Sequence, residues 1–118
     1  METNELEKQL SIVLHCLRTC RRRYVIQSLE DTNESKTTRQ LARQIAGKEN
    51  GMHSTCVSGE QYKNVYNALS QSHLPTLNGA DVIVYDPKRQ TVQRGPMFAL
   101  AALVLNLSQP AIETFYRQ

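Results

Sequence analysis

The sequence predicts a mainly α-helical domain with one small β-hairpin. Apolar residues recur at helical spacing over most of the first 70 residues, and a short run of Val, Ile and Tyr follows Asn78-Gly79. Of the 118 residues, 40% are hydrophobic, only 6% are aromatic and none is Trp, so the core must consist mainly of Leu, Ile, Val and Ala. A chain of this length is sufficient for one domain core.

The N-terminal segment, residues 4–29, carries apolar residues at helical spacing on both sides of a run of three arginines, residues 21–23. Because this basic run interrupts the pattern, we expect either one bent helix or two helices. Thr19 is a candidate N-cap for a second helix that begins at Cys20. Polar, turn-forming residues follow at 30–36, and a loop is expected there.

A short amphipathic helix is predicted next. Its candidate N-caps are Thr37 and Thr38, and Gly47 and Asn50-Gly51 are expected to end it. Its apolar face is expected to contain Leu41, Ala42, Ile45 and Ala46.

A third helix is expected, with Ser58 or Gly59 as its N-cap and an end before Pro75. Its apolar stripe consists of Tyr62, Val65, Tyr66 and Leu69. The opposite face is polar and contains Lys63, Asn64, Asn67, Ser70 and Gln71. Asn and Gln can bond bidentately to adenine, and Lys can bond guanine or a phosphate, so this face is predicted to read DNA bases. An ordinary solvated helix face is the alternative.

A β-hairpin is predicted after the third helix. Residues 82–85 are strongly β-prone, residues 86–90 supply turn chemistry, and residues 91–94 can return as the partner strand before Gly95-Pro96. Three helices followed by a hairpin with a cationic tip is the order of a winged helix-turn-helix. We therefore assign residues 1–95 to such a domain, with its third helix in the major groove.

Basic side chains outside the third helix are predicted to grip DNA phosphates. They lie at the hairpin, in the arginine run and at the start of the helix that follows residue 37, where the hydroxyl of Thr38 adds a donor. The predicted set is Lys88, Arg89, Arg94, Arg21, Arg22, Thr38 and Arg39. Protection of the hairpin edge is an alternative role for the hairpin cations. The arginines of the run could instead pair with Glu30 or Asp31.

The C-terminal segment, residues 96–118, is predicted to add a helix, with Pro110 at a kink or at the start of a separate last turn. Between Met97 and Leu107 it is apolar on nearly every face, which a helix on a small domain cannot hide. A homodimer is therefore expected through Met97, Phe98, Leu100, Leu103, Val104 and Leu107. The alternative is a helix that packs between the first helix and the sheet of the same subunit.

No motif of a known catalytic chemistry is present, so the sequence predicts neither an enzyme nor a bound cofactor. The spacings of Cys16 with Cys20 and of His53 with Cys56 are only weakly ligand-like, and no metal site is expected. Without a secretory signal or a cysteine framework, the protein is expected to be cytoplasmic and reduced. The longest apolar run, residues 97–105, is too short to span a membrane.

Four motifs occur in order along the chain. They are RRRYV at residues 21–25, LARQIA at 41–46, VYNALSQSHLPTL at 65–77 and VYD at 84–86. Together they resemble a family of small archaeal, chiefly haloarchaeal, winged-helix domains that are assigned as transcriptional regulators. The resemblance implies a winged-helix fold and a DNA-binding role over about residues 18–95. Within it, His73 is expected to be structural, with Leu74 and Leu77 in the core.

We therefore expect a dimeric, sequence-specific regulator of transcription that binds double-stranded DNA. The net charge of +3 and the pI of 8.9 permit a polyanionic partner but do not require one. One alternative is a winged-helix interaction or adaptor module that does not bind DNA. Another is a metal- or thiol-responsive repressor, which requires Cys16, Cys20 and Cys56 to converge.

Overall fold

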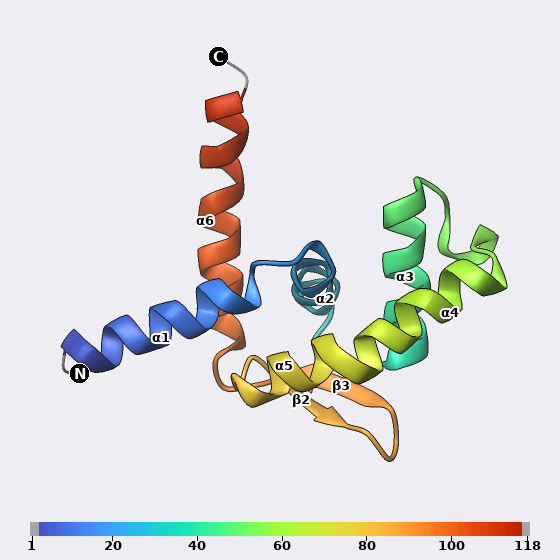
Figure 1. The fold of residues 1–118 in the computed structure, drawn as a ribbon, viewed down its shortest axis with the longest axis horizontal. Helices are drawn as coiled ribbons and strands as arrows, with labels where there is room; N and C mark the ends of the chain where they lie inside the picture. Colours follow the sequence, from blue (N-terminus) through green and yellow to red (C-terminus); the bar gives the residue numbers. More distant parts are fainter. Residues whose placement is uncertain (1–2, 117–118) are drawn as a thin grey trace.

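A computed structural model describes residues 3–116 and contains six α-helices and three short β-strands in this range (Figure 1). A 3₁₀ turn at Ser54–Cys56 precedes α4, and a π-helical segment at Leu69–His73 joins α4 to α5. In chain order the elements are α1 (Thr3–Cys16), α2 (Cys20–Glu30), β1 (Lys36–Thr37), α3 (Thr38–Asn50), α4 (Gly59–Ala68), α5 (Leu74–Gly79), β2 (Ile83–Asp86), β3 (Thr91–Arg94) and α6 (Phe98–Tyr116).

The three strands form one antiparallel sheet in the order β1-β3-β2. The predicted hairpin is confirmed, with Ile83 opposite Arg94 and Asp86 opposite Thr91. Strand β1 lies within the predicted loop and cap, and its Lys36 lies opposite Val92. Helix α2, β1, α3, α4, β2 and β3 follow one another as in a winged helix. The predicted fold class is confirmed: the protein is mainly helical, with a small sheet and a C-terminal helix, compatible with a winged-helix fold.

Side-chain caps set the start of three helices where the sequence predicted them. Thr19 caps α2, and its hydroxyl accepts a hydrogen bond from the backbone N–H of Arg22. Thr37 and Ser58 form capping boxes with the glutamines three residues later and so fix the starts of α3 and α4. Each box satisfies two backbone donors that would otherwise lack partners.

The prediction that Gly47 ends α3 is wrong. The helix continues to Asn50, and Gly51 adopts the left-handed conformation that closes it. A Cβ at Gly47 would lie 2.8 Å from the backbone oxygen of Met52, so this glycine permits the close approach of the following loop.

Helix α4 ends at Ala68, before Pro75 as predicted, but the chain remains helical beyond this point and through Pro75. The backbone N–H of Leu74 reaches the oxygen of Leu69, five residues back, and this wider turn carries the chain directly into α5. Pro75 occupies the first turn of α5, where its missing N–H costs no regular helical bond. Leu74 and Leu77 lie fully buried, as predicted.

The core lies between α2, α3, the α4–α5 helix and the inner face of the sheet. Its largest fully buried side chains are aliphatic, in agreement with the composition: Ile26, Leu29, Leu41, Ile45, Leu69, Leu74, Leu77 and Ile83. Burial of this apolar surface is the main force that holds these helices and the sheet together.

Helices α1 and α6 extend away from this core in different directions (Figure 1). Helix α6 packs on α2 and runs unbroken from Phe98 to Tyr116, so Pro110 starts no separate turn. Its inner face, which includes Phe98 and Leu105, is buried against the same subunit, so the prediction that Phe98 contributes to a dimer interface is wrong. Packing within the subunit, which was the alternative to a dimer, therefore accounts for one face of α6 only.

Within residues 3–116, one helix, α6, is long and apolar enough to cross a membrane by length and composition alone. The run-length criterion missed it because polar residues such as Asn106 and Gln109 interrupt the apolar run without making the whole helix polar. Most of α6 is exposed in the structure. That the protein uses no membrane stays a prediction.

Candidate nucleic-acid interface

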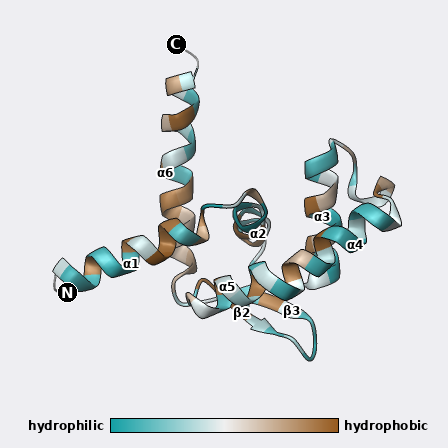
Figure 2. Cartoon of the chain, in the orientation of Figure 1, coloured by the Kyte–Doolittle hydropathy of each residue, from teal (hydrophilic) through white to brown (hydrophobic). Residues whose placement is uncertain are grey.

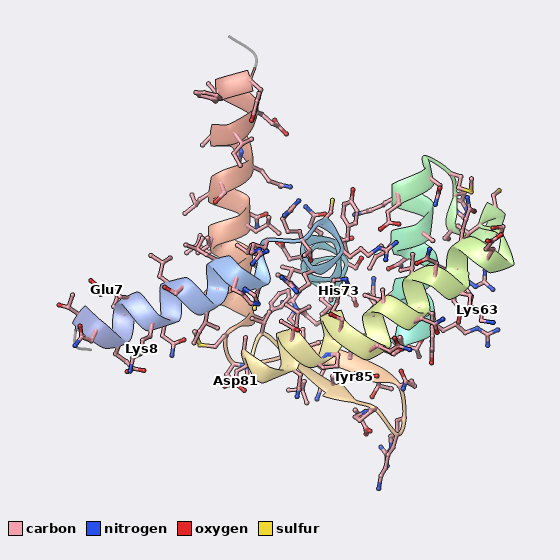
Figure 3. All side chains as sticks on the ribbon, viewed as in Figure 1. Glu7, Lys8, Lys63, His73, Asp81 and Tyr85 are labelled. Atoms are coloured by element: carbon pink, nitrogen blue, oxygen red, sulfur yellow. The ribbon has the colours of Figure 1, made fainter. Side chains whose placement is uncertain are left out.

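The polar face of α4 is open to solvent. Of the five residues that are predicted to read bases, four are exposed, namely Lys63, Asn64 and Asn67 of α4 and Gln71 of the π-helical segment that follows it, and Figure 3 places Lys63 on the outer side of the helix. The fifth, Ser70, is half-buried, and its hydroxyl donates to the backbone oxygen of Tyr66 at 2.8 Å. The hydroxyl of Ser70 is thus occupied by a hydrogen bond within the helical backbone, whereas the other four side chains are free to contact a ligand.

Contacts with α3 fix the orientation of α4. The guanidinium of Arg43 lies over the ring of Tyr62, 4.6 Å from its centroid, and Val65 and Leu69 are buried beneath the helix. The rings of Tyr62 and Tyr66 also lie 5.8 Å apart along the same side. With its apolar side held in this way, α4 presents its polar row on a rigid support.

The hairpin tip, residues 86–91, is organised by its own side chains. Asp86 Oδ1 accepts the backbone N–H groups of Lys88 and Arg89, at 3.0 and 3.2 Å. The side chains of Lys88 and Arg89 remain exposed, and the Arg89–Asp86 ion pair, at 4.0 Å with Arg89 84% exposed, is too weak to hold the guanidinium. Both cations are therefore available to a phosphate.

A lock formed by Gln90 ties the hairpin tip to the start of α3. Gln90 has a φ of 54°, and its side-chain amide donates to Pro87 at 2.8 Å. Its Oε1 accepts from the hydroxyls of Thr38, at 2.8 Å, and Tyr85, at 3.1 Å. The backbone that carries the hairpin cations Lys88 and Arg89 is thus held in a fixed relation to α3, on which α4 packs. This lock was not predicted, because residues 86–90 indicate a turn in the sequence but not its contact with Thr38.

Two of the side chains that were predicted to contact phosphate, Arg94 and Thr38, form hydrogen bonds within the protein instead. The guanidinium of Arg94 donates to the backbone oxygens of Leu29, Glu30 and Thr32 at the end of α2, and lies 4.8 Å from the centroid of the Phe98 ring. Thr38 is fully buried and donates to Gln90. We therefore assign both side chains structural roles in place of phosphate binding: Arg94 caps the end of α2, and Thr38 holds Gln90.

The arginine run is also largely internal. Arg22 is buried and donates to the backbone oxygens of His15 and Cys16, where it ends α1. Arg21 pairs with Glu49, with Nε 2.6 Å from Oε1, and this hydrogen bond raises the pKa of Arg21. Arg21 thus pairs with neither of the two expected acids. Of the predicted cations outside α4, only Arg39, Lys88 and Arg89 remain exposed without a structural partner among the described residues.

His73 lies inside the π-helical segment, where its Nδ1 is buried and has no hydrogen-bond partner in the described part of the chain (Figure 3). Burial lowers its pKa, and the nearby charges of Arg22 and Arg21 lower it further, whereas Glu49 opposes them. This environment favours the neutral imidazole and supports the structural role that was predicted.

We expect the stability of the fold to decrease as the pH falls through about 6.5, the ordinary His pKa. The unfolded chain takes up the proton at that pH, whereas folded His73 resists it, so protonation favours unfolding. His73→Phe should flatten the dependence of the urea midpoint on pH between 7 and 5. Exposed His15→Phe serves as the control, and an unchanged slope in His73→Phe would contradict the assignment.

The three cysteines are free; Cys16 is buried, and Cys20 and Cys56 are exposed. Burial raises the pKa of the Cys16 thiol, with a smaller opposing effect from Arg22. Among residues 3–116, no group of three or more His, Cys, Asp or Glu side chains is placed to hold a metal ion. The described residues therefore give no support to a metal-responsive centre.

A family model described as a domain of unknown function, DUF7344, matches residues 14–93. The chain belongs to this family. The match begins near the end of α1 and finishes in β3, so it contains α4 and the hairpin but omits α6. No curated protein and no solved structure matches the chain.

Proposed function

We propose that this protein is a dimeric transcriptional regulator that binds double-stranded DNA, with α4 in the major groove and the hairpin on the backbone or in the minor groove. One observation carries the proposal: α4 and the π-helical segment after it expose a row of side chains suited to base reading, while the hairpin holds two free cations, and both α4 and the hairpin are fixed to α3. The four-motif resemblance to small archaeal winged-helix regulators supports the same function. The proposal involves no catalysis and no cofactor, and a cytoplasmic location stays a prediction.

The exposed side chains divide into two classes under this proposal. Lys63, Asn64, Asn67 and Gln71 face base edges, and together they would distinguish one sequence from another. Arg39, Lys88 and Arg89 contact phosphates, which fix the position of the protein on any duplex. The net charge is modest, so we expect binding to depend on these few placed contacts.

Asn67→Ala tests the base-reading role. A site first selected from random duplexes should lose about 10- to 100-fold in affinity, because one bidentate contact to adenine contributes about 1–3 kcal/mol. Binding to random-sequence DNA should stay within about twofold. Fluorescence anisotropy measures both, and Asn33→Ala, an exposed loop asparagine before β1, is the matched control. Equal losses on both duplexes, or none on either, would contradict the docking of α4.

A protein-interaction module remains the second candidate, and one observation favours it. The outer face of α6 exposes Leu103 and Leu107 at 55% and 67%, which is a surface suited to a protein partner. If the folded protein fails to bind duplex DNA at low salt, this candidate replaces the first. Charge reversal at Lys88 and Arg89 would then leave partner binding unchanged.

A further inference from the structure

The exposed apolar surface of this protein is concentrated on its two terminal helices. Ten of the twelve large apolar side chains that are exposed in residues 3–116 lie in α1 and α6, at exposures from 39% to 79%. Figure 2 shows apolar bands along both helices where they extend from the core. Soluble proteins rarely leave contiguous apolar surface of this kind uncovered.

The α1 stripe consists of Leu6, Leu10 and Leu14, which recur every four residues. The α6 stripe consists of Leu100, Leu103 and Leu107, at i, i+3 and i+7. On α6 this stripe lies on the face opposite to the buried one, so the helix is apolar both inside and outside. A helix with two apolar faces needs a second surface to pack against.

Two grooves between α1 and α6 can accept side chains from a further helix. One, of about 180 Å³, lies between Leu6 and Leu10 of α1 and Leu100 and Val104 of α6. A second, of about 490 Å³, is bounded by Leu14 of α1 and several α6 residues towards its C-terminal end. The walls of the first groove are almost wholly apolar and suit leucine side chains from another helix, whereas the second also has polar walls at Arg23, Gln109 and Glu113.

We propose that the α1 and α6 stripes together bind the same stripes of a second copy, so that four helices cover one another about a two-fold axis. Ten large apolar side chains, exposed at 39–79% on α1 and α6, supply a surface of roughly the size of a standard interface, which buries about 800 Å² per partner. A two-fold interface uses the same patch twice, which two matching leucine stripes provide. Helix α1 thus joins α6 in the dimer interface, which the sequence predicted for α6 alone.

The polar residues of α6 favour a protein partner over a lipid bilayer. Asn106 donates to the Glu30 carboxylate at 3.0 Å, which fixes the middle of α6 to α2. Gln109 and Glu113 lie on the next turns and are exposed. Burial of these groups in hydrocarbon would be costly, whereas at a dimer edge they remain in water.

This interface leaves the proposed DNA surface free. Figure 3 places Glu7 of α1 and Lys63 of α4 at opposite ends of the molecule. Two copies joined through α1 and α6 can therefore each present α4, as a dimeric regulator requires for two half-sites. The inference deepens the proposed function in this respect, but the association itself does not depend on DNA binding.

Light scattering on the full chain tests the proposal. The wild type should have twice the chain mass of 13.4 kDa at micromolar concentration. Leu6→Glu with Leu10→Glu, and separately Leu103→Glu with Leu107→Glu, should each raise the dimer Kd at least 100-fold and yield monomers. Circular dichroism checks that they fold, and Leu→Ser pairs at the same positions replace any variant that does not.

The matched control carries two new glutamates on exposed apolar residues outside the stripes, Ile12→Glu with Met52→Glu, and should remain dimeric. A monomeric wild type, or a dimer that survives the α1 substitutions, would overturn the proposal. So would a wild type that floats with anionic phospholipid vesicles and is monomeric without them. A dimer that fails to bind DNA would contradict the proposed DNA binding and leave this inference standing. A monomer that binds DNA would contradict this inference and the dimeric state, but not the proposed DNA binding.

Discussion

Reversing both wing cations, with Lys88→Glu and Arg89→Glu, is expected to weaken binding to any duplex DNA by about 100-fold or more at low salt. Two phosphate contacts are lost and two repulsions are added, and the magnitude of the slope of log K against log salt should decrease by about 2. The hairpin should keep its shape, because Asp86 holds it through the backbone N–H groups of these residues. Anisotropy titrations at four or more salt concentrations measure both quantities.

The matched control for this charge reversal is Lys8→Glu with Arg18→Glu. Both are exposed cations, Lys8 on α1 and Arg18 in the turn between α1 and α2, and the pair changes the net charge by the same amount. The affinity of the control should stay within a few-fold of the wild type. Equal losses in the two variants would mean that overall charge, and not the wing, governs binding.

The largest effect on stability is expected for Gly95→Ala. A Cβ at this position would lie 2.5 Å from the backbone oxygen of Asp81 and 3.0 Å from the backbone of Ile83. The backbone cannot easily move away, because the Gly95 N–H donates to Val82 and the Met97 N–H donates to Asp81. We expect a loss of about 3 kcal/mol in the free energy of unfolding, a large share of the stability of a small domain.

Thermal unfolding followed by circular dichroism measures this loss, with Gly79→Ala as the control. At Gly79 a Cβ meets nothing within 4 Å, and the residue is helical, so alanine should be neutral or raise the stability by about 0.5–1 kcal/mol. If Gly95→Ala has the Tm of the wild type, the described packing of the β3–α6 junction is wrong.

Local chemistry made much of the fold predictable. Thr19, Thr37 and Ser58 are caps whose side chains satisfy backbone donors within three residues, so the sequence near each helix start contains the whole interaction. The hairpin was predictable for the same reason, because β-prone residues flank a turn that Asp86 closes.

Features that depend on distant parts of the chain escaped prediction. Arg94 caps the end of α2, more than 60 residues away, and only the tertiary structure reveals that its guanidinium is occupied. Strand β1 is two residues long and exists because β3 lies beside it. The passage through Pro75 depends on a π turn that propensities do not encode.

The exposed residues of the candidate site could be predicted from the sequence, whereas the hydrogen bonds that occupy its other side chains could not. Exposed helix positions follow from periodicity, so the row that includes Lys63 and Asn67 was found. Cations next to turns look alike in sequence whether they point to solvent or to carbonyls. Arg89 and Arg94 therefore received the same prediction, and the structure separates them.

A titration of the wild-type protein into a labelled random-sequence duplex, by fluorescence anisotropy at several salt concentrations, tests DNA binding most directly. The proposed contacts of Arg39, Lys88 and Arg89 predict binding at low salt and a slope of log K against log salt of about −3. Folded protein that shows no binding at low salt would contradict the DNA-binding function and direct the search to protein partners.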